Sequence, residues 1–330
     1  MKYAFQEVPA LISRLNRLSN NDPHRQHLLA YLCSLFAELP YHHIPELEFD
    51  DKKRAKIISS KAYRELVASQ VSGGLDVSRT LAEVDYVEGP EQSDVVIAET
   101  ERTIAVGVLF DRMLFIGFRG TILNSLSDWY VNARLPKTPL NSYERVTVGK
   151  IYKSRHGSCH KGFGDEAKRI SSEIMKKLTD RQIREPDEVY LTGHSLGGAV
   201  AALSQEFIKF AETHVFTYGA PRYCDKNAVI SHPYNRPQMY RREGDMVPSV
   251  PPLWMGYGEE PVQYGVNGEV YPHNKELFCS SLVRWIRFGW GLAKSHDMEN
   301  YRADLGRTAK IAQPDLLLVP HPRIAAKQLT

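Results

Sequence analysis

The stretch "VYLTGHSLGGAVAALSQEF", residues 189–207, contains a serine between glycines in the run "GHSLG" (193–197). A short apolar segment precedes this run, and an alanine-rich segment of helical composition follows it. This order predicts a strand that turns sharply into a helix, with Ser195 exposed at the turn. Gly193 and Gly197 lack side chains where such a strand and helix come closest. The stretch therefore predicts either a nucleophilic serine or a glycine-rich turn without chemistry.

Two further features of the stretch bear on this choice. The residues after Ser195 begin a helix, whose free N–H groups favour developing negative charge. A phosphate-binding loop would also use such a helix start, but it needs a lysine and a longer glycine spacing that the stretch lacks. A serine nucleophile additionally needs a histidine base, an acid that orients the base, and a second oxyanion donor.

The bulk properties are those of an ordinary globular protein. The chain has 330 residues, enough for one large α/β domain with an extension. Hydrophobic residues make up 42% of it and charged residues 25%. A net charge of +3 and scattered Lys and Arg argue against a nucleic-acid partner. The four cysteines are widely spaced and form no CxxC pair, so no disulfide framework, metal site or cofactor is expected.

The expected location of the chain follows from the same sequence. The first twenty residues, "MKYAFQEVPALISRLNRLSN", contain no uninterrupted apolar core and no small-residue cleavage site, so a secretory signal peptide is not expected. No run approaches the roughly 18 apolar residues of a membrane span. The dispersed cysteines favour a reducing compartment. We therefore expect a cytoplasmic protein, with export by a leaderless secretion system as the alternative.

The chain divides into a helical beginning and an alternating remainder. Residues 1–90 are expected to be mainly helical, with Asp22-Pro23 starting a helix that stops before Pro40. Strand-like runs appear from about residue 94, and strands then alternate with helices, which predicts a mostly parallel sheet covered by helices. The expected helices lie at 51–68, 164–180, 196–211, 275–293 and 297–305, with an irregular stretch at 248–273.

The base and the acid are not fixed by spacing. In the order typical of α/β hydrolases, the acid follows the serine and the histidine comes last. The histidines downstream of Ser195 are His214, His232, His273, His296 and His321. Acidic residues in this region are numerous. The spacing alone therefore leaves several combinations open.

Sequence blocks in the right order resemble one family. The blocks are "FIGFRGT" (115–121), "CHKGFGDEA" (159–167), the serine stretch, "FTYGAPR" (216–222), "YRREGDMVPSVPP" (240–252) and, with looser spacing, "SHDMENY" (295–301). Together they resemble the class 3 lipases, which include fungal-type triacylglycerol lipases, feruloyl esterases, and plant and bacterial relatives. The resemblance covers roughly residues 95–305.

The resemblance implies a fold and a division of the chain. The expected fold is the α/β-hydrolase fold, a mostly parallel central sheet flanked by helices. Residues 1–90 would form a helical N-terminal extension packed on the core. Residues 91–308 would form the lipase-like domain, and residues 309–330 an extended C-terminal tail.

The resemblance also implies roles for individual residues. Ser195 would be the nucleophile, Asp245 the orienting acid and His296 the base. The oxyanion hole would use the backbone N–H groups of Leu196 and Thr121. Removing one such donor typically lowers the rate by ~10²–10³.

Two of these assignments have competitors in the sequence. Asp225, in "PRYCD", competes with Asp245, which the Val-Pro context favours. His273 competes with His296, although "PHN" is also compatible with a hairpin. His194 is expected to point away from Ser195 and to have a structural role.

Three other residues near the blocks are expected to be structural. His160 would brace the oxyanion turn. Arg119 would pair with a carboxylate beneath that turn. Cys159 adjoins His160 without an organised acid or metal-ligand set, and it is expected to be a buried thiol.

The segment after Thr121 corresponds to the lid of the family. In "ILNSLSDWYVN" (122–132), an apolar face at helical spacing would cover the site and bind a lipid surface on opening. That face consists of Leu123, Leu126, Trp129 and Tyr130. The alternative is that these side chains pack into the core. A second apolar stretch, "LVRWIRFGWGLAKSH" (282–296), is expected either to line an acyl pocket or to belong to the core.

The sequence thus predicts a serine hydrolase that cleaves carboxylic esters of lipids through an acyl-enzyme, without cofactor or metal. The expected partners are a lipid or other ester substrate and, transiently, a lipid interface. Alternatives within enzymes are a phospholipase A1 or lysophospholipase and a short-chain esterase. The alternative from another class is a non-catalytic hydrolase-fold protein that binds lipid or a partner. The oligomeric state is not predicted.

Overall fold

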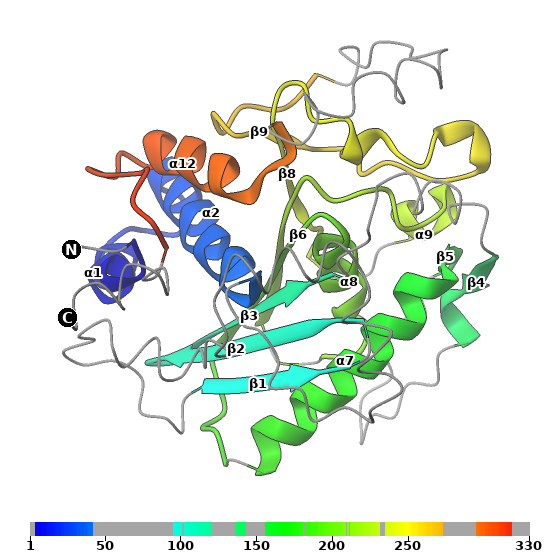
Figure 1. Ribbon diagram of the computed structural model, residues 1–330, viewed down its shortest axis with the longest axis horizontal. Helices are drawn as coiled ribbons and strands as arrows, with labels where there is room; N and C mark the ends of the chain where they lie inside the picture. The colour runs from blue at the N-terminus through cyan, green and yellow to red at the C-terminus, as the bar shows by residue number, and fades with distance from the viewer. Residues whose placement is uncertain are drawn as a thin grey trace, which may run out of the picture.

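The computed structural model contains a seven-stranded sheet covered by helices on both faces (Figure 1). It describes residues 4–41, 95–100, 102–120, 136–142, 156–180, 182–208, 210, 212–231, 235–272 and 295–318. The strands of the sheet, in spatial order, are β1 (Val95–Glu99), β2 (Ile104–Phe110), β3 (Met113–Arg119), β6 (Glu188–His194), β7 (Glu212–Tyr218), β8 (Gln238–Arg241) and β9 (Tyr264–Gly265). A separate pair is formed by β4 (Lys137–Pro139) and β5 (Ser158–His160).

The sheet is mostly parallel, as expected from the resemblance. The pairs β1–β2 and β2–β3 are antiparallel, and β3, β6, β7, β8 and β9 then run parallel to one another. Because β6 lies in the middle of the sheet, its carboxyl end opens at the edge where α/β proteins bind their ligands. The α/β-hydrolase fold is confirmed, with β6 leading into the serine turn and a helix.

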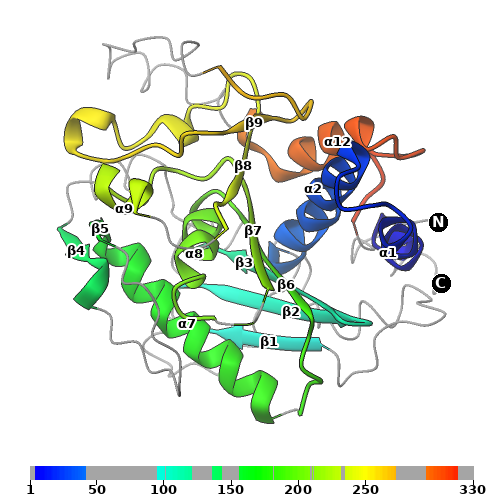
Figure 2. The same cartoon turned by 180° about the vertical axis from the view of Figure 1, so that it is seen from behind.

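The helices form two layers, seen from opposite sides in Figures 1 and 2. Helices α7 (Lys161–Asp180), α8 (Leu196–Ser204) and α9 (Lys226–Ile230) pack on one face. Helices α1 (Val8–Asn16), α2 (Pro23–Glu38) and α12 (Met298–Thr308) pack on the other. Short 3₁₀ turns complete the described elements: η1 (Ala4–Glu7), η2 (Leu39–Tyr41), η4 (Leu140–Ser142), η5 (Val247–Ser249) and η6 (Leu253–Met255).

Helix α2 is a buried helix of the core. It begins as the sequence predicts, with the Asp22 carboxylate accepting from the His24 N–H at 2.8 Å. Residues 28–38 are all buried, which fits a helix that is largely apolar on every side. Two strands hydrogen-bond to its backbone: Thr192 Oγ1 donates to the Cys33 carbonyl at 3.0 Å, and Tyr218 Oη donates to the Ala30 carbonyl at 2.5 Å.

An aromatic row runs across the sheet beneath α2. It consists of Phe115, Tyr190, Phe216, Tyr240 and Tyr264, one from each parallel strand, with neighbouring ring centroids 5.0 to 6.4 Å apart. Phe36 of α2 stacks on the first ring at 4.3 Å. Buried aromatic pairs of this kind contribute beyond the area they bury. The row therefore fixes α2 to the sheet.

The chain after α12 returns to the N-terminal helices. Arg302 of α12 forms a buried ion pair with Glu38 of α2 at 2.5 Å and donates to the Pro314 and Leu316 carbonyls. The Ala4 N–H donates to the Leu317 carbonyl at 2.9 Å. The described part of the predicted tail, residues 309–318, is thus attached to α12 and to the start of the chain.

The largest boundary error concerns the helix after Ser195, and two predicted helices lie outside the described residues. The helix predicted at 196–211 ends at Ser204, because the N–H groups of Glu206 and Phe207 bond carbonyls three residues back and tighten the chain into turns. The helices predicted at 51–68 and 275–293 fall outside the described ranges. None of the described helices is long and apolar enough to cross a membrane.

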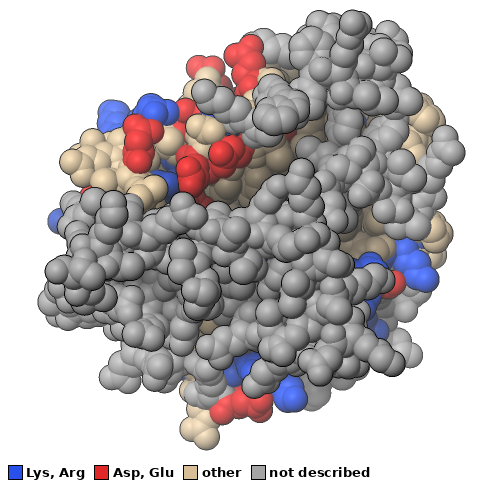
Figure 3. All heavy atoms as spheres, viewed as in Figure 1, with Lys and Arg blue, Asp and Glu red and all other residues tan. Residues whose placement is uncertain are grey.

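The visible surface near α12 carries charges of both signs. Figure 3 shows acidic side chains gathered on this side of the molecule, with basic side chains among them. Arg307 pairs there with Asp304 and Asp315, both at 2.6 Å. Exposed pairs like these contribute little to stability. The fold depends instead on the buried layer formed by α2 and the aromatic row.

The stacking of Phe36 on the aromatic row predicts a large cost for truncating this side chain. We expect Phe36→Ala to lower the free energy of unfolding by about 3–5 kcal/mol, because it leaves a cavity between α2 and the row. Urea denaturation followed by circular dichroism measures the change. Lys177→Ala, on the exposed side of α7, is the control and should change stability by less than about 0.5 kcal/mol. Equal effects of the two changes would contradict the assignment of α2 to the cooperative core.

Candidate active site

Ser195 occupies the turn between β6 and α8. Its backbone has φ 54° and ψ −128°, a conformation that non-glycine residues rarely adopt. The turn is held by the Ser195 N–H, which donates to the Tyr218 carbonyl of the neighbouring strand at 2.9 Å. A strained serine between a central strand and a helix is the arrangement that exposes a hydroxyl for chemistry. The alternative of an ordinary glycine-rich turn does not account for this strain.

A histidine and a carboxylate converge on this serine. His296 Nε2 lies 2.8 Å from Ser195 Oγ, and His296 Nδ1 lies 2.9 Å from Asp245 Oδ2. An ionised carboxylate only accepts hydrogen bonds, so Nδ1 carries the imidazole proton and Nε2 presents its lone pair to the serine hydroxyl. The three residues are separated by up to 101 positions in the chain. The structure therefore brings together the three side chains that the resemblance singled out.

Asp245 is buried and fully hydrogen-bonded. Its side chain has no exposed surface, whereas that of His296 is 12% exposed. Besides His296, the carboxylate accepts from the Val247 N–H at 2.9 Å and from Tyr301 Oη at 2.6 Å. Three donors compensate the loss of hydration that burial of a carboxylate entails. The acid is thus held in one orientation toward the histidine.

The end of β7 must be followed by a glycine for this pair to form. Gly219 has φ 58°, and a Cβ atom there would lie 2.7 Å from Asp245 Oδ2 and 3.0 Å from the His296 ring. Any side chain would displace the carboxylate or the imidazole. The "FTYGAPR" block therefore includes a glycine whose absent side chain is part of the site.

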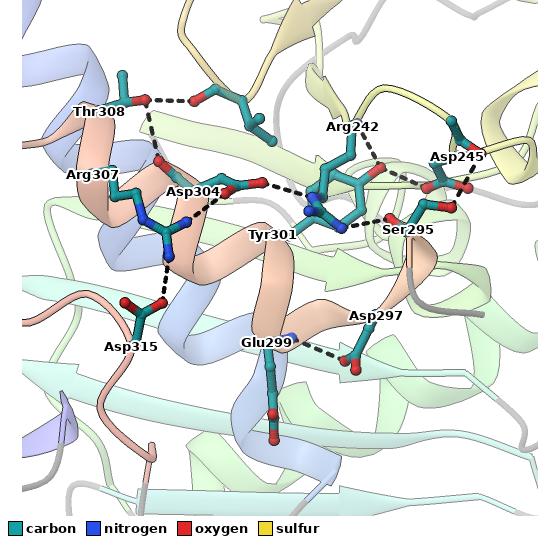
Figure 4. A network of polar contacts seen from close by, with 12 residues as sticks. Arg242, Asp245, Ser295, Asp297, Glu299, Tyr301, Asp304, Arg307, Thr308 and Asp315 are labelled. Carbon is teal, nitrogen blue, oxygen red and sulfur yellow. Dashed lines mark hydrogen bonds and ion pairs between the residues drawn. The ribbon is translucent and has the colours of Figure 1, made fainter. Parts of the chain in front are cut away.

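A set of polar contacts joins the loop that carries Asp245 to the segment that carries His296 (Figure 4). Arg242 donates to Asp304 Oδ2 at 2.7 Å and to the Ser295 carbonyl at 3.1 Å. Ser295 Oγ in turn donates to the Gly244 carbonyl at 3.1 Å. These bonds fix the acid and the histidine relative to each other independently of their own contact.

Tyr301 is a member of the site for which the sequence predicted no role. Its hydroxyl accepts from the Arg242 N–H at 3.0 Å and donates to Asp245 Oδ2, and Figure 4 shows it pointing from α12 toward the carboxylate. Burial, reinforced by the Asp245 charge, raises the pKa of Tyr301 well above its usual value, so the hydroxyl stays a donor. The signal was its place at the end of the "SHDMENY" block.

His194 also contacts the histidine, through the backbone. As expected, its side chain does not hydrogen-bond Ser195, but its Nε2 lies 2.6 Å from the carbonyl oxygen of His296. Burial, followed by the neighbouring His296, holds the pKa of His194 well below its usual value. The sequence suggested a structural role without indicating this partner.

Of the two competing residues, Asp225 is used elsewhere. Asp225 is the N-cap of α9, where its carboxylate accepts from the Ala228 and Ser158 N–H groups, each at 2.8 Å. His273 lies outside the described residues. The Asp225 carboxylate thus caps α9, and the carboxylate that contacts His296 is that of Asp245.

The residues expected to be structural are found in three different settings. His160 is buried in β5, and its Nδ1 accepts from the Phe163 N–H at 3.4 Å. Arg119 donates to the Pro40 carbonyl at 3.3 Å. Cys159 is a buried thiol, as predicted.

Part of the predicted site lies outside the described residues. This holds for Thr121 and for the predicted lid residues Leu123, Leu126, Trp129 and Tyr130. Leu196 is described, as the first residue of α8. Among the residues that the structure describes, no group of three or more His, Cys, Asp or Glu side chains is arranged to hold a metal ion.

Comparison with known proteins agrees with the geometry. Residues 115–255 match the family model described as "Lipase (class 3)". The lipase of Rhizomucor miehei is 32% identical over 181 residues, which cover 50% of this chain and 45% of the relative. The secreted mono- and diacylglycerol lipase A of Penicillium cyclopium is 26% identical over 215 residues, 63% of each chain. The chain thus spans about half to two thirds of the length of these relatives.

Solved structures of lipases are also similar to this chain, at low identity. The mono- and diacylglycerol lipase from Aspergillus oryzae is 18% identical, with a TM-score of 0.45, and the match covers 72% of this chain and 79% of that one. The Lip2 lipase from Yarrowia lipolytica is 19% identical, with a TM-score of 0.47 over 72% and 77%.

The relatives correct the predicted cytoplasmic location. The lipases of Penicillium cyclopium and Penicillium camembertii that match this chain are named as secreted proteins. The prediction relied on the first residues of the sequence and on unpaired cysteines. The cysteine pattern does not determine the location, because burial in the core, as for Cys33, protects a thiol from oxidation without a reducing compartment.

The strained serine turn, most of strand β3 and the loop that carries Asp245 lie within the matched segment. Residues 115–255, which carry these features, are thus the part of the chain that matches the class 3 lipase family.

Proposed function

We propose that this protein is a serine hydrolase that cleaves carboxylic esters of lipids through an acyl-enzyme. The observation that carries the proposal is the contact of His296 Nε2 with Ser195 Oγ at 2.8 Å, with Nδ1 held by Asp245 at 2.9 Å. This is the geometry in which a neutral imidazole accepts the serine proton during attack. A lipid- or partner-binding protein without activity has no need of a strained serine, an aligned base and a buried acid together.

The reaction follows from the positions of these groups. Ser195 Oγ attacks the ester carbonyl carbon while His296 Nε2 takes the hydroxyl proton, and Asp245 stabilises the imidazolium that forms. His296 then gives the proton to the leaving alcohol, and the acyl group remains on the serine. A water molecule, activated in turn by His296, attacks the acyl-serine and releases the fatty acid.

The oxyanion hole of this proposal consists of the backbone N–H groups of Leu196 and Thr121. Leu196 is the first residue of α8, so its N–H is one of those that helix geometry leaves without an intrahelical partner. Gly120, the neighbour of Thr121, packs tightly against the serine turn. A Cβ atom built on Gly120 would lie only 2.5 Å from the Cβ of Leu196. The close approach of β3 to the turn supports two donors on one side of Ser195.

The match to the lipase family and the exposed surface of η6 support a lipid substrate. Two relatives are named as mono- and diacylglycerol lipases, which favours acylglycerols over phospholipids as the ester cleaved here. Turn η6 follows the Asp245 loop and exposes Leu253 and Trp254, with 49% and 79% of their surface accessible. Large exposed apolar side chains of this kind are suited to contact with a lipid surface.

The nucleophile is tested by Ser195→Ala. We expect turnover of a p-nitrophenyl ester to fall by on the order of 10⁶, because the attacking oxygen is lost. Circular dichroism should remain that of the wild type, since the alanine fits the same turn. A variant that is folded and retains near-wild-type esterase activity would disprove the role of Ser195.

The lipid substrate is tested by Trp254→Ser. We expect the rate on emulsified acylglycerol to fall about tenfold relative to the rate on a monomeric p-nitrophenyl ester, because the variant loses apolar surface that the interface would bury. The measurement compares the two rates for wild type and variant. Leu317→Ser, an exposed position beside the chain start, is the control and should leave the ratio unchanged. An unchanged ratio in Trp254→Ser would contradict interfacial contact by η6.

A further inference from the structure

The imidazole of His194 is placed behind the proposed base. Its Nε2 lies 2.6 Å from the backbone carbonyl oxygen of His296, and the two ring centroids are 4.5 Å apart. A carbonyl oxygen only accepts hydrogen bonds, so Nε2 of His194 must carry a proton and donate it. The bond therefore fixes the tautomer of His194 and one backbone atom of His296.

This bond connects the base to the strand that carries the nucleophile. His194 is the last residue of β6, paired with Arg119 of β3 and Tyr218 of β7 in the middle of the sheet. The backbone of residue 194 is therefore held on both sides. The contacts of Arg242 and Ser295 tie the His296 segment to the Asp245 loop, whereas the His194 bond ties it directly to the residue before Ser195. The His194 bond therefore helps to fix the distance between His296 Nε2 and Ser195 Oγ.

The N-terminal helical region reaches His194. Tyr41 of η2 donates its hydroxyl proton to the His194 carbonyl at 3.3 Å, and the same hydroxyl lies 3.5 Å from His194 Nδ1. The Tyr41 and His194 ring centroids are 6.1 Å apart. Because η2 directly follows α2, the buried helix of the core also positions a side chain against the end of β6.

The surroundings of His194 favour a neutral donor. Its ring faces the phenol of Tyr41, the imidazole of His296 and the ring of Tyr301 at 5.9 Å, with Arg119 on the adjacent strand. Burial raises the pKa of Tyr41 to about 12, so it adds no charge. When His296 becomes an imidazolium during the reaction, a second positive charge behind it would oppose that step. A neutral N–H donor holds the backbone of the base without this repulsion.

We propose that His194 is a positioning residue, which donates to the His296 carbonyl and holds the base at the distance that Ser195 requires. Tyr41 anchors His194 from the N-terminal helical region. This inference rests on the proposed function, because positioning a base matters only if Ser195 reacts. It assigns to the histidine of the "GHSLG" run a function that its position beside the serine does not reveal.

The test compares two substitutions of His194 by amide side chains of different length. In His194→Gln, the amide N–H₂ group can take the place of Nε2 and donate to the His296 carbonyl. In His194→Asn, the same group is too short to do so. We expect His194→Gln to keep kcat within about threefold of wild type, the size of one neutral hydrogen bond. We expect His194→Asn to lower kcat ~10²-fold at similar KM, because the base is misplaced. Tyr41→Phe should lower kcat by about threefold.

Two results would overturn the inference. The first is equal kcat in the two amide variants, whether near wild type or equally reduced, because reach would then be irrelevant. The second is a loss in His194→Asn confined to KM. If equal kcat is accompanied by equally lowered thermal melting points of His194→Gln and His194→Asn, the role of His194 is one of packing. If His194→Asn fails to fold, His194→Phe replaces it as the variant without a donor.

A readout without turnover separates this inference from the proposed function. The Nδ1 proton of His296 is hydrogen-bonded to Asp245. It should give a downfield proton NMR signal in wild type and His194→Gln. We expect this signal to broaden or disappear in His194→Asn. If the wild type hydrolyses no ester, the proposed function fails, and the NMR comparison still decides the placement of His296. An unchanged signal in His194→Asn would show that His194 does not position the base.

Discussion

The hydrogen bond between Asp245 and His296 is the contact on which the site depends. The carboxylate is completely buried, and its three donors come from α12, from the η5 turn and from the histidine itself. A buried carboxylate that lost one of these partners would carry an uncompensated charge, which is costly in a protein interior. The surrounding residues keep all three hydrogen bonds of the carboxylate in place. Gly219 leaves the space, Arg242 connects the two segments, and Tyr301 supplies a donor that stays protonated.

The layer formed by α2 explains why these loops have a fixed position. Helix α2 covers the aromatic row of the parallel strands, forms the buried Glu38–Arg302 pair with α12, and continues into η2 beside the serine turn. The same helix therefore supports the strand that presents Ser195 and the helix that follows His296. A single buried layer thus links the stability of the sheet to the geometry of the site.

The sequence predicted those parts of the structure that depend on local patterns. The Asp22 cap, the alternation of strands and helices, and the turn at Ser195 are encoded within a few residues, and the sequence blocks pointed to Asp245 and His296. Long-range contacts left no such signal. Neither the donation of His194 to the His296 carbonyl nor the place of α2 over the aromatic row follows from residue spacing, because each joins segments far apart in the chain. The predicted end of the helix after Ser195 was wrong: the chain turns at residues 205–207, where the Gln205 side chain donates to the distant Asn235 carbonyl at 3.1 Å.

All of the proposed chemistry requires that Ser195 is a nucleophile activated by His296 and Asp245. The most direct measurement is to treat the protein with a fluorophosphonate and to locate the adduct by mass spectrometry of its peptides. We expect a single adduct on the peptide that contains Ser195, formed by the folded protein and much more slowly by Asp245→Asn. Absence of an adduct on the folded wild-type protein, or an adduct on another residue, would contradict this role of Ser195.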